Sequence, residues 1–151
     1  MQDVLTLGGT LAAQARLQPE KVAVRDLARA MTFRVWNRRA CRLANALLGL
    51  GLEKGQRVAV LAYNCIEWAE IYAATAKAGL VAVPINFRLV GPEVSFIVEN
   101  AEASALIVQD ELAGVVEEIG AALPVPASRR IHFGARPCPA GYQDYEGLLA
   151  R

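Results

Sequence analysis

Glycine-rich turns that could cradle a phosphate are the first chemistry to look for in this chain. Two short glycine clusters occur, Gly8-Gly9-Thr10 and Gly49-Leu50-Gly51. Neither completes a GxGxxG or a GxxxxGK(S/T) pattern, and neither leads from a strand directly into a helix, as phosphate loops do. The residues themselves therefore predict no phosphate loop.

Nucleophilic and metal-ligating residues are few. His132 is the single histidine and falls within a predicted strand, so we interpret it as structural. Three serines, Ser95, Ser104 and Ser128, lack the nucleophile-elbow pattern of a catalytic triad. Cys65 is expected in the first turn of a helix, where the helix dipole would lower its pKa, but a small residue filling that turn is the favoured interpretation. The three cysteines are widely spaced and form no CxxC, so the sequence predicts no metal cluster.

One arginine stands beside an aromatic residue just after a predicted strand. Phe87 and Arg88 follow the apolar segment Leu80–Ile85. A guanidinium next to a ring suits a phosphate with a stacked base. We take Phe87 and Arg88 as candidate ligand contacts, with an ordinary loop arginine as the alternative. A second basic group could also bind anions, although a solvated helix face is the favoured interpretation; it comprises Arg34, Arg38, Arg39 and Arg42.

Apolar periodicity predicts strands that alternate with helices. Buried strands are expected at 57–62, 80–85, 105–108 and 130–133, and short outer strands at 21–25 and 31–33. Helices are expected at 5–17, 32–50, 64–78, 91–101 and 110–123, with a last one beginning near residue 144. Asn64 would cap the third helix, with Glu67 completing a capping box.

The alternation predicts an α/β fold with a mainly parallel sheet flanked by helices through βαβ crossovers. We expect a single domain over 1–151: an opening helix and short strands in 1–33, a βαβ core in 34–134, and a loop with the start of a last helix in 135–151. Ligands of such sheets bind beyond the carboxyl ends of the strands. The loops at those ends are Tyr63-Asn64, Asn86–Leu89, Gln109-Asp110 and Gly134-Ala135.

Length and composition narrow the class of protein. The 151 residues (16.2 kDa) correspond to about one domain. A hydrophobic fraction of 54% with 21% charged residues excludes a disordered chain. Sixteen basic against fifteen acidic residues argue against a nucleic-acid binder. The longest uncharged runs, about ten residues, are too short to span a bilayer. Asp3, with no nearby Lys or Arg, argues against a signal peptide, so we expect a reduced, cytoplasmic protein.

Several stretches carry a resemblance to a known family, in order and nearly from end to end. They lie at 21–24, 31–33, 37–47, 51–60, 64–68 and 76–86. Together they resemble the N-terminal part of adenylate-forming acyl-CoA synthetases, in the AMP-binding superfamily. Asn86-Phe87-Arg88-Leu89 before Gly91-Pro92-Glu93 is similar to the fatty and aryl acyl-CoA ligase branch in particular. One departure is that Thr32 is followed by Val35 where the family usually has glutamate, so half of a capping box is lost.

The resemblance implies an activity for the complete enzyme. A carboxylate, ATP and CoA would yield an acyl-CoA through an acyl-adenylate, with ATP, Mg and CoA as cofactors. In the family the phosphate loop, the ribose-binding aspartate, the hinge and the catalytic lysine all follow the segment seen here. The resemblance also places Phe87 and Arg88 near the docking site of the CoA nucleotide.

No catalytic residue is therefore expected in these 151 residues, and the chain alone would be inactive. We expect a truncated piece of a longer enzyme, whose partner would be the rest of the synthetase. The alternative is a stand-alone binding or oligomerisation module with a self-association surface.

Overall fold

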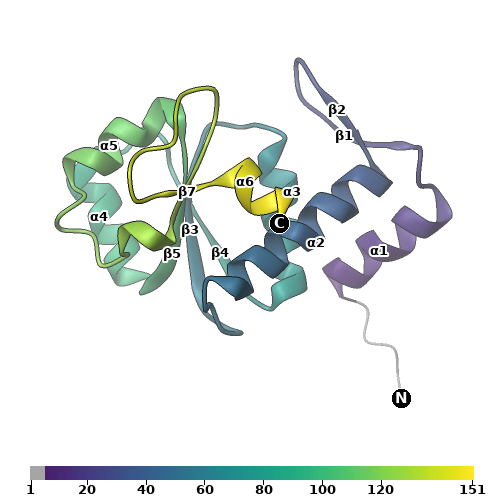
Figure 1. Cartoon of the computed structure of the whole chain (residues 1–151), viewed down its shortest axis with the longest axis horizontal. Coiled ribbons are helices and arrows are strands. Elements are labelled where there is room, and N and C mark those ends of the chain that lie inside the picture. The colour runs from purple at the N-terminus through teal and green to yellow at the C-terminus, as the bar shows by residue number, and fades with distance from the viewer. Residues whose placement is uncertain (1–5) are drawn as a thin grey trace.

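Five parallel strands form the central sheet of the computed structural model, which describes residues 6–151 (Figure 1). The strand order is β4-β3-β5-β6-β7. The strands are β3 (Arg57–Leu61), β4 (Val81–Ile85), β5 (Ala103–Gln109), β6 (Arg130–Phe133) and β7 (Gln143–Asp144). The predicted parallel α/β fold is confirmed, and so are the four strands expected in it, but β4 lies at the edge of the sheet and only its last residue, Ile85, is buried. The two-residue strand β7 is too short to leave a pattern in the sequence.

Helices cover both faces of this sheet and create two apolar cores. One face is covered by α2 (Phe33–Gly49), α3 (Glu67–Ala78) and α6 (Tyr145–Ala150). The opposite face is covered by α4 (Gly91–Asn100) and α5 (Ala113–Glu118). Among residues 6–151 we find no helix with the length and apolar character needed to cross a membrane.

The N-terminal elements pack outside this three-layer arrangement. Helix α1 (Leu7–Leu17) lies against α2 and α3, with Leu11 buried beside Ala40 and Ala73. The antiparallel hairpin of β1 (Val22–Arg25) and β2 (Ala30–Thr32) projects beyond α2 (Figure 1). Residue 5 of the expected first helix lies outside the described residues.

Helix α2 begins where the sequence predicts. Thr32 occupies the N-cap, and its hydroxyl oxygen accepts a hydrogen bond from the Val35 N–H at 3.3 Å. Because Val35 has no carboxylate to reach back to Thr32, only this half of a capping box is present, as expected. The helix then buries Leu43 and Leu47 against the sheet.

The predicted cap of α3 is wrong. The helix begins at Glu67 with Ile66 at the N-cap position, and no side chain caps it. The Glu67 carboxylate is bound by Arg29 of the β1–β2 hairpin and does not reach back toward Asn64. Cys65 therefore precedes the helix, where the dipole argument for an acidic thiol does not apply.

The helix expected at 110–123 is also wrong in length. The chain makes a 3₁₀ turn at Asp110–Leu112, and α5 then spans only Ala113–Glu118. The buried Arg130 side chain donates to the Gly120 carbonyl at 2.7 Å and to the Val125 carbonyl at 2.9 Å. These bonds from the next strand satisfy carbonyl groups after α5, where the chain turns and does not continue as a helix.

Candidate functional site

The four predicted loops meet at the carboxyl edge of the sheet. The chain passes from β3 to β4 on one side and then to β5 on the other side of β3, so the topological switch point lies between β3 and β5. There the backbone N–H of Tyr63 donates to the side-chain oxygen of Gln109 at 2.8 Å. This bond bridges the two loops at the switch point.

The loops after β5 and β6 close on each other. One carboxylate oxygen of Asp110 accepts the Ala135 N–H at 2.7 Å and the Arg136 N–H at 2.9 Å. A hydrogen bond shared with Glu111, together with these two N–H groups, lowers the pKa of Asp110 to about 2. Gly134 has φ +139°, and a Cβ there would lie 2.3 Å from the Asp110 carboxyl carbon. The Asp110 carboxylate of this half is therefore used within the fold.

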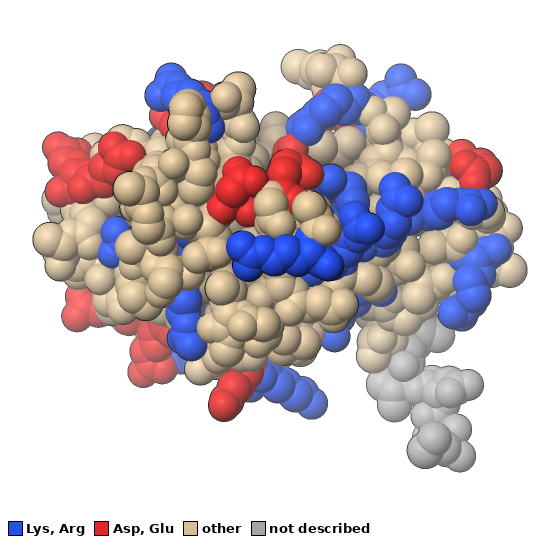
Figure 2. Space-filling model, viewed as in Figure 1, with Lys and Arg blue, Asp and Glu red and all other residues tan. Residues whose placement is uncertain are grey.

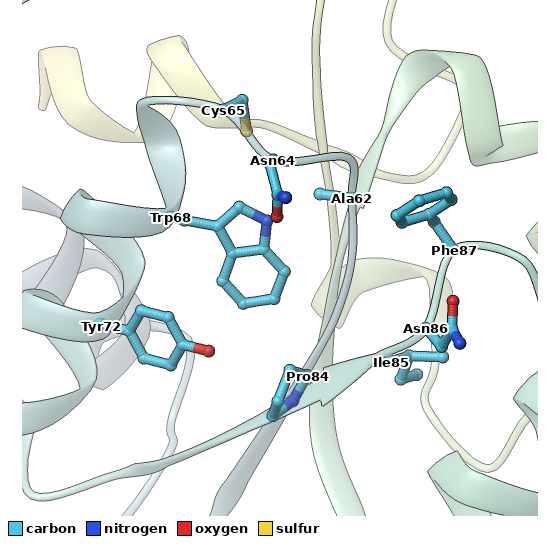
Figure 3. Close-up of a pocket in the computed structure, with 9 residues that line it drawn as sticks. All are labelled: Ala62, Asn64, Cys65, Trp68, Tyr72, Pro84, Ile85, Asn86 and Phe87. Atoms are coloured by element: carbon cyan, nitrogen blue, oxygen red, sulfur yellow. The ribbon is translucent and has the colours of Figure 1, made fainter. Parts of the chain in front are cut away.

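The loops after β3 and β4 enclose a pocket of about 380 Å³ (Figure 3). Its walls are largely aromatic and amide side chains: Ala62, Asn64, Cys65, Trp68, Tyr72, Pro84, Ile85, Asn86 and Phe87. The loops meet because β3 and β4 are parallel neighbours. Trp68 and Tyr72, one helical turn apart on α3, stack with ring centroids 5.2 Å apart. Phe87 stands across the pocket from this pair (Figure 3).

Hydrogen bonds and ring contacts hold the pocket walls. The indole N–H of Trp68 donates to the Tyr63 carbonyl at 2.9 Å. The Tyr63 ring meets the Phe87 ring edge-on, with centroids 4.9 Å apart. The Asn86 side-chain oxygen accepts the Arg88 N–H at 3.0 Å, which orders the turn after β4. The walls are therefore organised without any bound molecule.

Of the two predicted ligand contacts, Phe87 lines the pocket, and Arg88 is the next residue along the chain, outside the lining. The Arg88 guanidinium carbon lies 5.5 Å from the centre of the Phe87 ring, in cation–π geometry. The Arg88 side chain is exposed, and no carboxylate among residues 6–151 forms an ion pair with it. An exposed guanidinium beside an aromatic ring has the chemistry to bind a phosphate next to a flat base.

The remaining candidates have structural surroundings. His132 is buried within β6, with 2% of its surface exposed. Cys65 lines the pocket, but burial, with a contribution from the Glu67 charge, raises its pKa to about 12 and keeps the thiol protonated. Within the described part of the chain we find no group of three or more side chains suited to hold a metal ion.

The four arginines of α2 do not act as one group. Figure 2 shows basic side chains along α2, where Arg34, Arg38 and Arg42 are exposed. Arg34 pairs with Glu20 on the surface. Arg39 instead turns toward Glu70 and Glu146 and is three-quarters buried. A predominantly solvated helix face, the favoured interpretation, describes this surface.

Sequence reasoning missed two pocket residues, Trp68 and Tyr72, which were given no function. Asn64 was placed correctly in a loop at the carboxyl edge, although it was also expected to cap a helix. A signal for the pocket was available, because Asn64 lies three residues after the end of β3 and Asn86 directly follows β4. Loops that follow adjacent parallel strands must lie side by side.

Comparison with known proteins identifies the family. The family model described as AMP-binding enzyme matches residues 11–141. The fatty acid–acyl-carrier-protein ligase ScoC of Streptomyces coeruleorubidus is 39% identical over 119 residues, 79% of this chain and 23% of ScoC.

Two solved structures extend the comparison to the fold. The anthranilate CoA ligase AuaEII, in complex with anthranoyl-AMP, superposes with a TM-score of 0.89 at 29% identity, covering 97% of this chain and 28% of AuaEII. The inhibitor-bound N-terminal domain of FACL13 from Mycobacterium tuberculosis gives 0.81 at 29% identity, covering 96% of this chain and 35% of that domain.

The chain therefore belongs to the AMP-binding enzyme family, and it corresponds to the N-terminal portion of the acyl-CoA synthetases in that family. It spans less than a quarter of the length of ScoC. The resemblance inferred from the sequence motifs is confirmed.

Proposed function

We propose that this chain serves as the N-terminal part of an acyl-activating ligase. The complete enzyme would join a carboxylate to a thiol, using ATP and Mg to form an acyl-adenylate and CoA to accept the acyl group. Residues 1–151 would make up one N-terminal subdomain that contributes a binding surface and no catalytic group. The family match supports this proposal, as do the relatives named as acid–thiol ligases.

The observation that carries the assignment is the exposed Arg88 guanidinium beside the ring of Phe87, which lines an aromatic pocket. ScoC is named for a carrier-protein thiol and AuaEII for CoA, so relatives of this chain differ in the thiol that they use. CoA carries a nucleotide in addition to its thiol arm. A positive charge beside Phe87 suits that nucleotide, and we therefore propose CoA as the acceptor, with Phe87 and Arg88 as contacts.

The test is the Arg88→Ala variant of the complete enzyme. We expect the KM for CoA to rise about tenfold, because a charge-assisted contact to phosphate contributes about 1.5 kcal/mol or more. Formation of the acyl-adenylate, followed by ATP–pyrophosphate exchange, should stay within about twofold, as this half-reaction does not use CoA. Arg42→Ala, an exposed arginine on α2, is the matched control. An unchanged KM for CoA would rule out the assignment.

We further propose that the rest of the synthetase covers α4. Val90 and Phe96 expose 60% and 66% of their surfaces beside a shallow apolar hollow that includes Leu89 and Ile97. In sedimentation experiments the isolated chain should self-associate through this surface, and Phe96→Ser should weaken that association. A monomer at high concentration would count against the proposal.

The cysteines support a reducing compartment such as the cytoplasm. Cys41, Cys65 and Cys138 are all free thiols. Secreted domains of this size use cysteines mainly in disulfides.

A further inference from the structure

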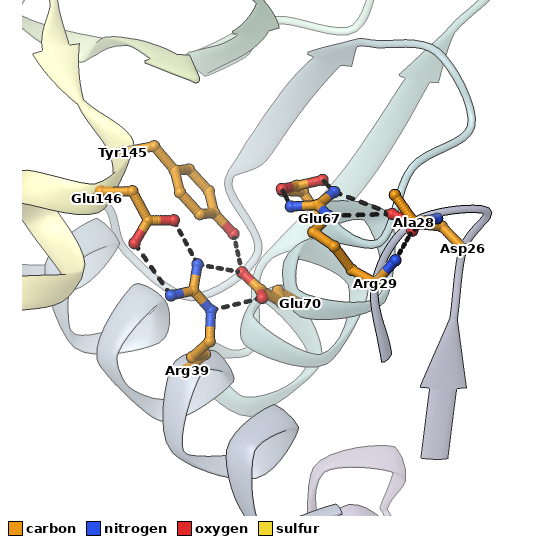
Figure 4. A network of polar contacts seen from close by, with 8 residues as sticks. All are labelled: Asp26, Ala28, Arg29, Arg39, Glu67, Glu70, Tyr145 and Glu146. Carbon is orange, nitrogen blue, oxygen red and sulfur yellow. Dashed lines mark hydrogen bonds and ion pairs between the residues drawn. The ribbon is translucent and has the colours of Figure 1, made fainter. Parts of the chain in front are cut away.

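The tip of the β1–β2 hairpin reaches across to the start of α3 (Figure 4). Both terminal nitrogens of Arg29 donate to the Glu67 carboxylate, at 2.6 Å and 3.0 Å. This two-point contact joins residues that are 38 positions apart in the chain. It is the geometry in which arginine fixes the orientation of a carboxylate as well as its position.

Arg29 is itself held in place by the turn at the hairpin tip. The Asp26 carboxylate accepts the N–H groups of Ala28 and Arg29 at 2.9 Å and 2.7 Å. Its second oxygen accepts a hydrogen bond from the Arg29 guanidinium at 3.0 Å. The two backbone bonds lower the pKa of Asp26, so the carboxylate stays charged. The guanidinium is thereby oriented before it meets Glu67.

Arg29 helps to keep Glu67 charged. Only 8% of the Glu67 surface is exposed. Burial is the largest single influence and raises the pKa of Glu67, but the contact with Arg29, a backbone N–H and the Cys65 thiol together outweigh it, and the pKa lies below its ordinary value. Without Arg29 the carboxylate would be buried without its cationic partner, which is costly.

Glu67 belongs to the chain segment that supplies one wall of the pocket. Glu67 is the first residue of α3, between the pocket residues Cys65 and Trp68. Helices α1 and α2 are capped by threonine hydroxyls, whereas α3 has no side-chain cap. Its first backbone bond, from the Trp68 N–H to the Cys65 carbonyl, is 3.3 Å long. The contact from Arg29 therefore fixes a helix start that has no cap of its own.

We propose that Arg29 is a positioning residue for the pocket: it holds the Asn64–Trp68 wall in the shape that receives the ligand, without touching the ligand itself. The effect on ligand affinity rests on the proposed function, whereas the effect on the wall does not. Through the contact between Arg29 and Glu67, the β1–β2 hairpin thereby fastens the start of α3, at the carboxyl edge of the sheet, to the N-terminal elements.

The experiment compares Arg29→Ala with Arg29→Lys in the whole chain. Arg34→Ala, which breaks the exposed pair with Glu20, serves as the matched control. Hydrogen exchange of residues 62–72 reports on the wall. CoA binding is followed by Trp68 fluorescence in a Trp36→Phe background, so that a single tryptophan remains in the chain.

Arg29→Ala should speed exchange in residues 62–72 about tenfold and leave β5 and β6 unchanged. It should also weaken CoA binding about tenfold. Arg29→Lys, which keeps the charge but loses the two-point contact, should recover part of both effects, and the control should match the parent chain.

Unchanged exchange in residues 62–72 would overturn the proposal. So would an increase spread evenly over the sheet, because Arg29 would then only stabilise the fold. If the parent chain does not bind CoA, the proposed function fails, while the exchange pattern still decides the role of Arg29.

Discussion

The two halves of the carboxyl edge use their polar groups in opposite ways. Beyond β5 and β6, the Asp110 carboxylate takes up the N–H groups of Ala135 and Arg136, and the loops close on each other. Beyond β3 and β4, the loops leave a pocket open, and the guanidinium of Arg88, next to the pocket residue Phe87, has no carboxylate partner among residues 6–151. The carboxylate of one half is satisfied by backbone N–H groups, whereas the other half holds a pocket beside an exposed guanidinium.

This difference separates structural polar residues from ligand-binding ones. Polar groups inside a fold are almost always paired, so a paired group needs no ligand to explain it. The switch point between β3 and β5 would be the usual location of a ligand. Here the bond from the Tyr63 N–H to Gln109 occupies it, and the pocket lies one strand further out.

The largest loss of stability is expected when an added side chain disrupts the contact between the loops after β5 and β6. Gly134→Ala would place a Cβ 2.3 Å from the Asp110 carboxyl carbon, at a φ of +139° that side chains rarely adopt. We expect the free energy of unfolding to fall by about 3 kcal/mol, measured by urea denaturation. Gly114→Ala is the control, since nothing lies within 4 Å of its new Cβ. An equal loss of stability in the two variants would contradict the close packing of the loops after β5 and β6 around Asp110.

A smaller loss of stability should follow from removing the charge of Asp110, whose carboxylate joins the loops after β5 and β6. Asp110 has a pKa of about 2 in the fold against an ordinary 3.8. Its contribution to stability is therefore complete above about pH 4 and is lost as the pH falls toward 2. Asp110→Asn should destabilise the chain by about 1–2 kcal/mol at pH 7, and the difference should vanish near pH 2. Urea midpoints across this range measure it, with Glu99→Gln on α4 as the control for loss of a carboxylate. A difference that does not change with pH would show that the charge is not responsible.

The smallest effect on stability is expected in the open half. Arg88→Ala should change the free energy of unfolding by no more than about 0.5 kcal/mol, because the side chain is exposed and makes no ion pair within residues 6–151. Thermal and urea unfolding of the isolated chain provide the measurement. A loss above 1 kcal/mol would place Arg88 with the structural residues and remove the contrast between the two halves.

Much of the scaffold was predictable because it depends on local patterns. The apolar runs that became β3, β4, β5 and β6 mark strands by composition alone, although this pattern did not show that β4 is only partly buried. Thr32 marks the start of α2 through its own hydroxyl. The loops that build the pocket followed from the parallel sheet, and Phe87 and Arg88 were placed at its carboxyl edge for that reason.

The errors arose where distant residues override local preference. Glu67 is well spaced to reach back to Asn64, but Arg29 of a remote hairpin binds its carboxylate first. The helix expected to run to residue 123 stops at Glu118, and the Arg130 side chain from the following strand binds the carbonyl of Gly120 in the segment that does not become helical. Such contacts depend on the folded topology, which no local spacing contains.

The most direct test of the open pocket is an NMR titration of the 151-residue chain with CoA, following every assigned backbone amide. We predict shifts that concentrate at Asn64, Trp68, Phe87 and Arg88, with little change at Ala135 and Arg136. Shifts centred on the loops after β5 and β6, or none at millimolar CoA, would contradict the assignment of ligand binding to the β3–β4 half.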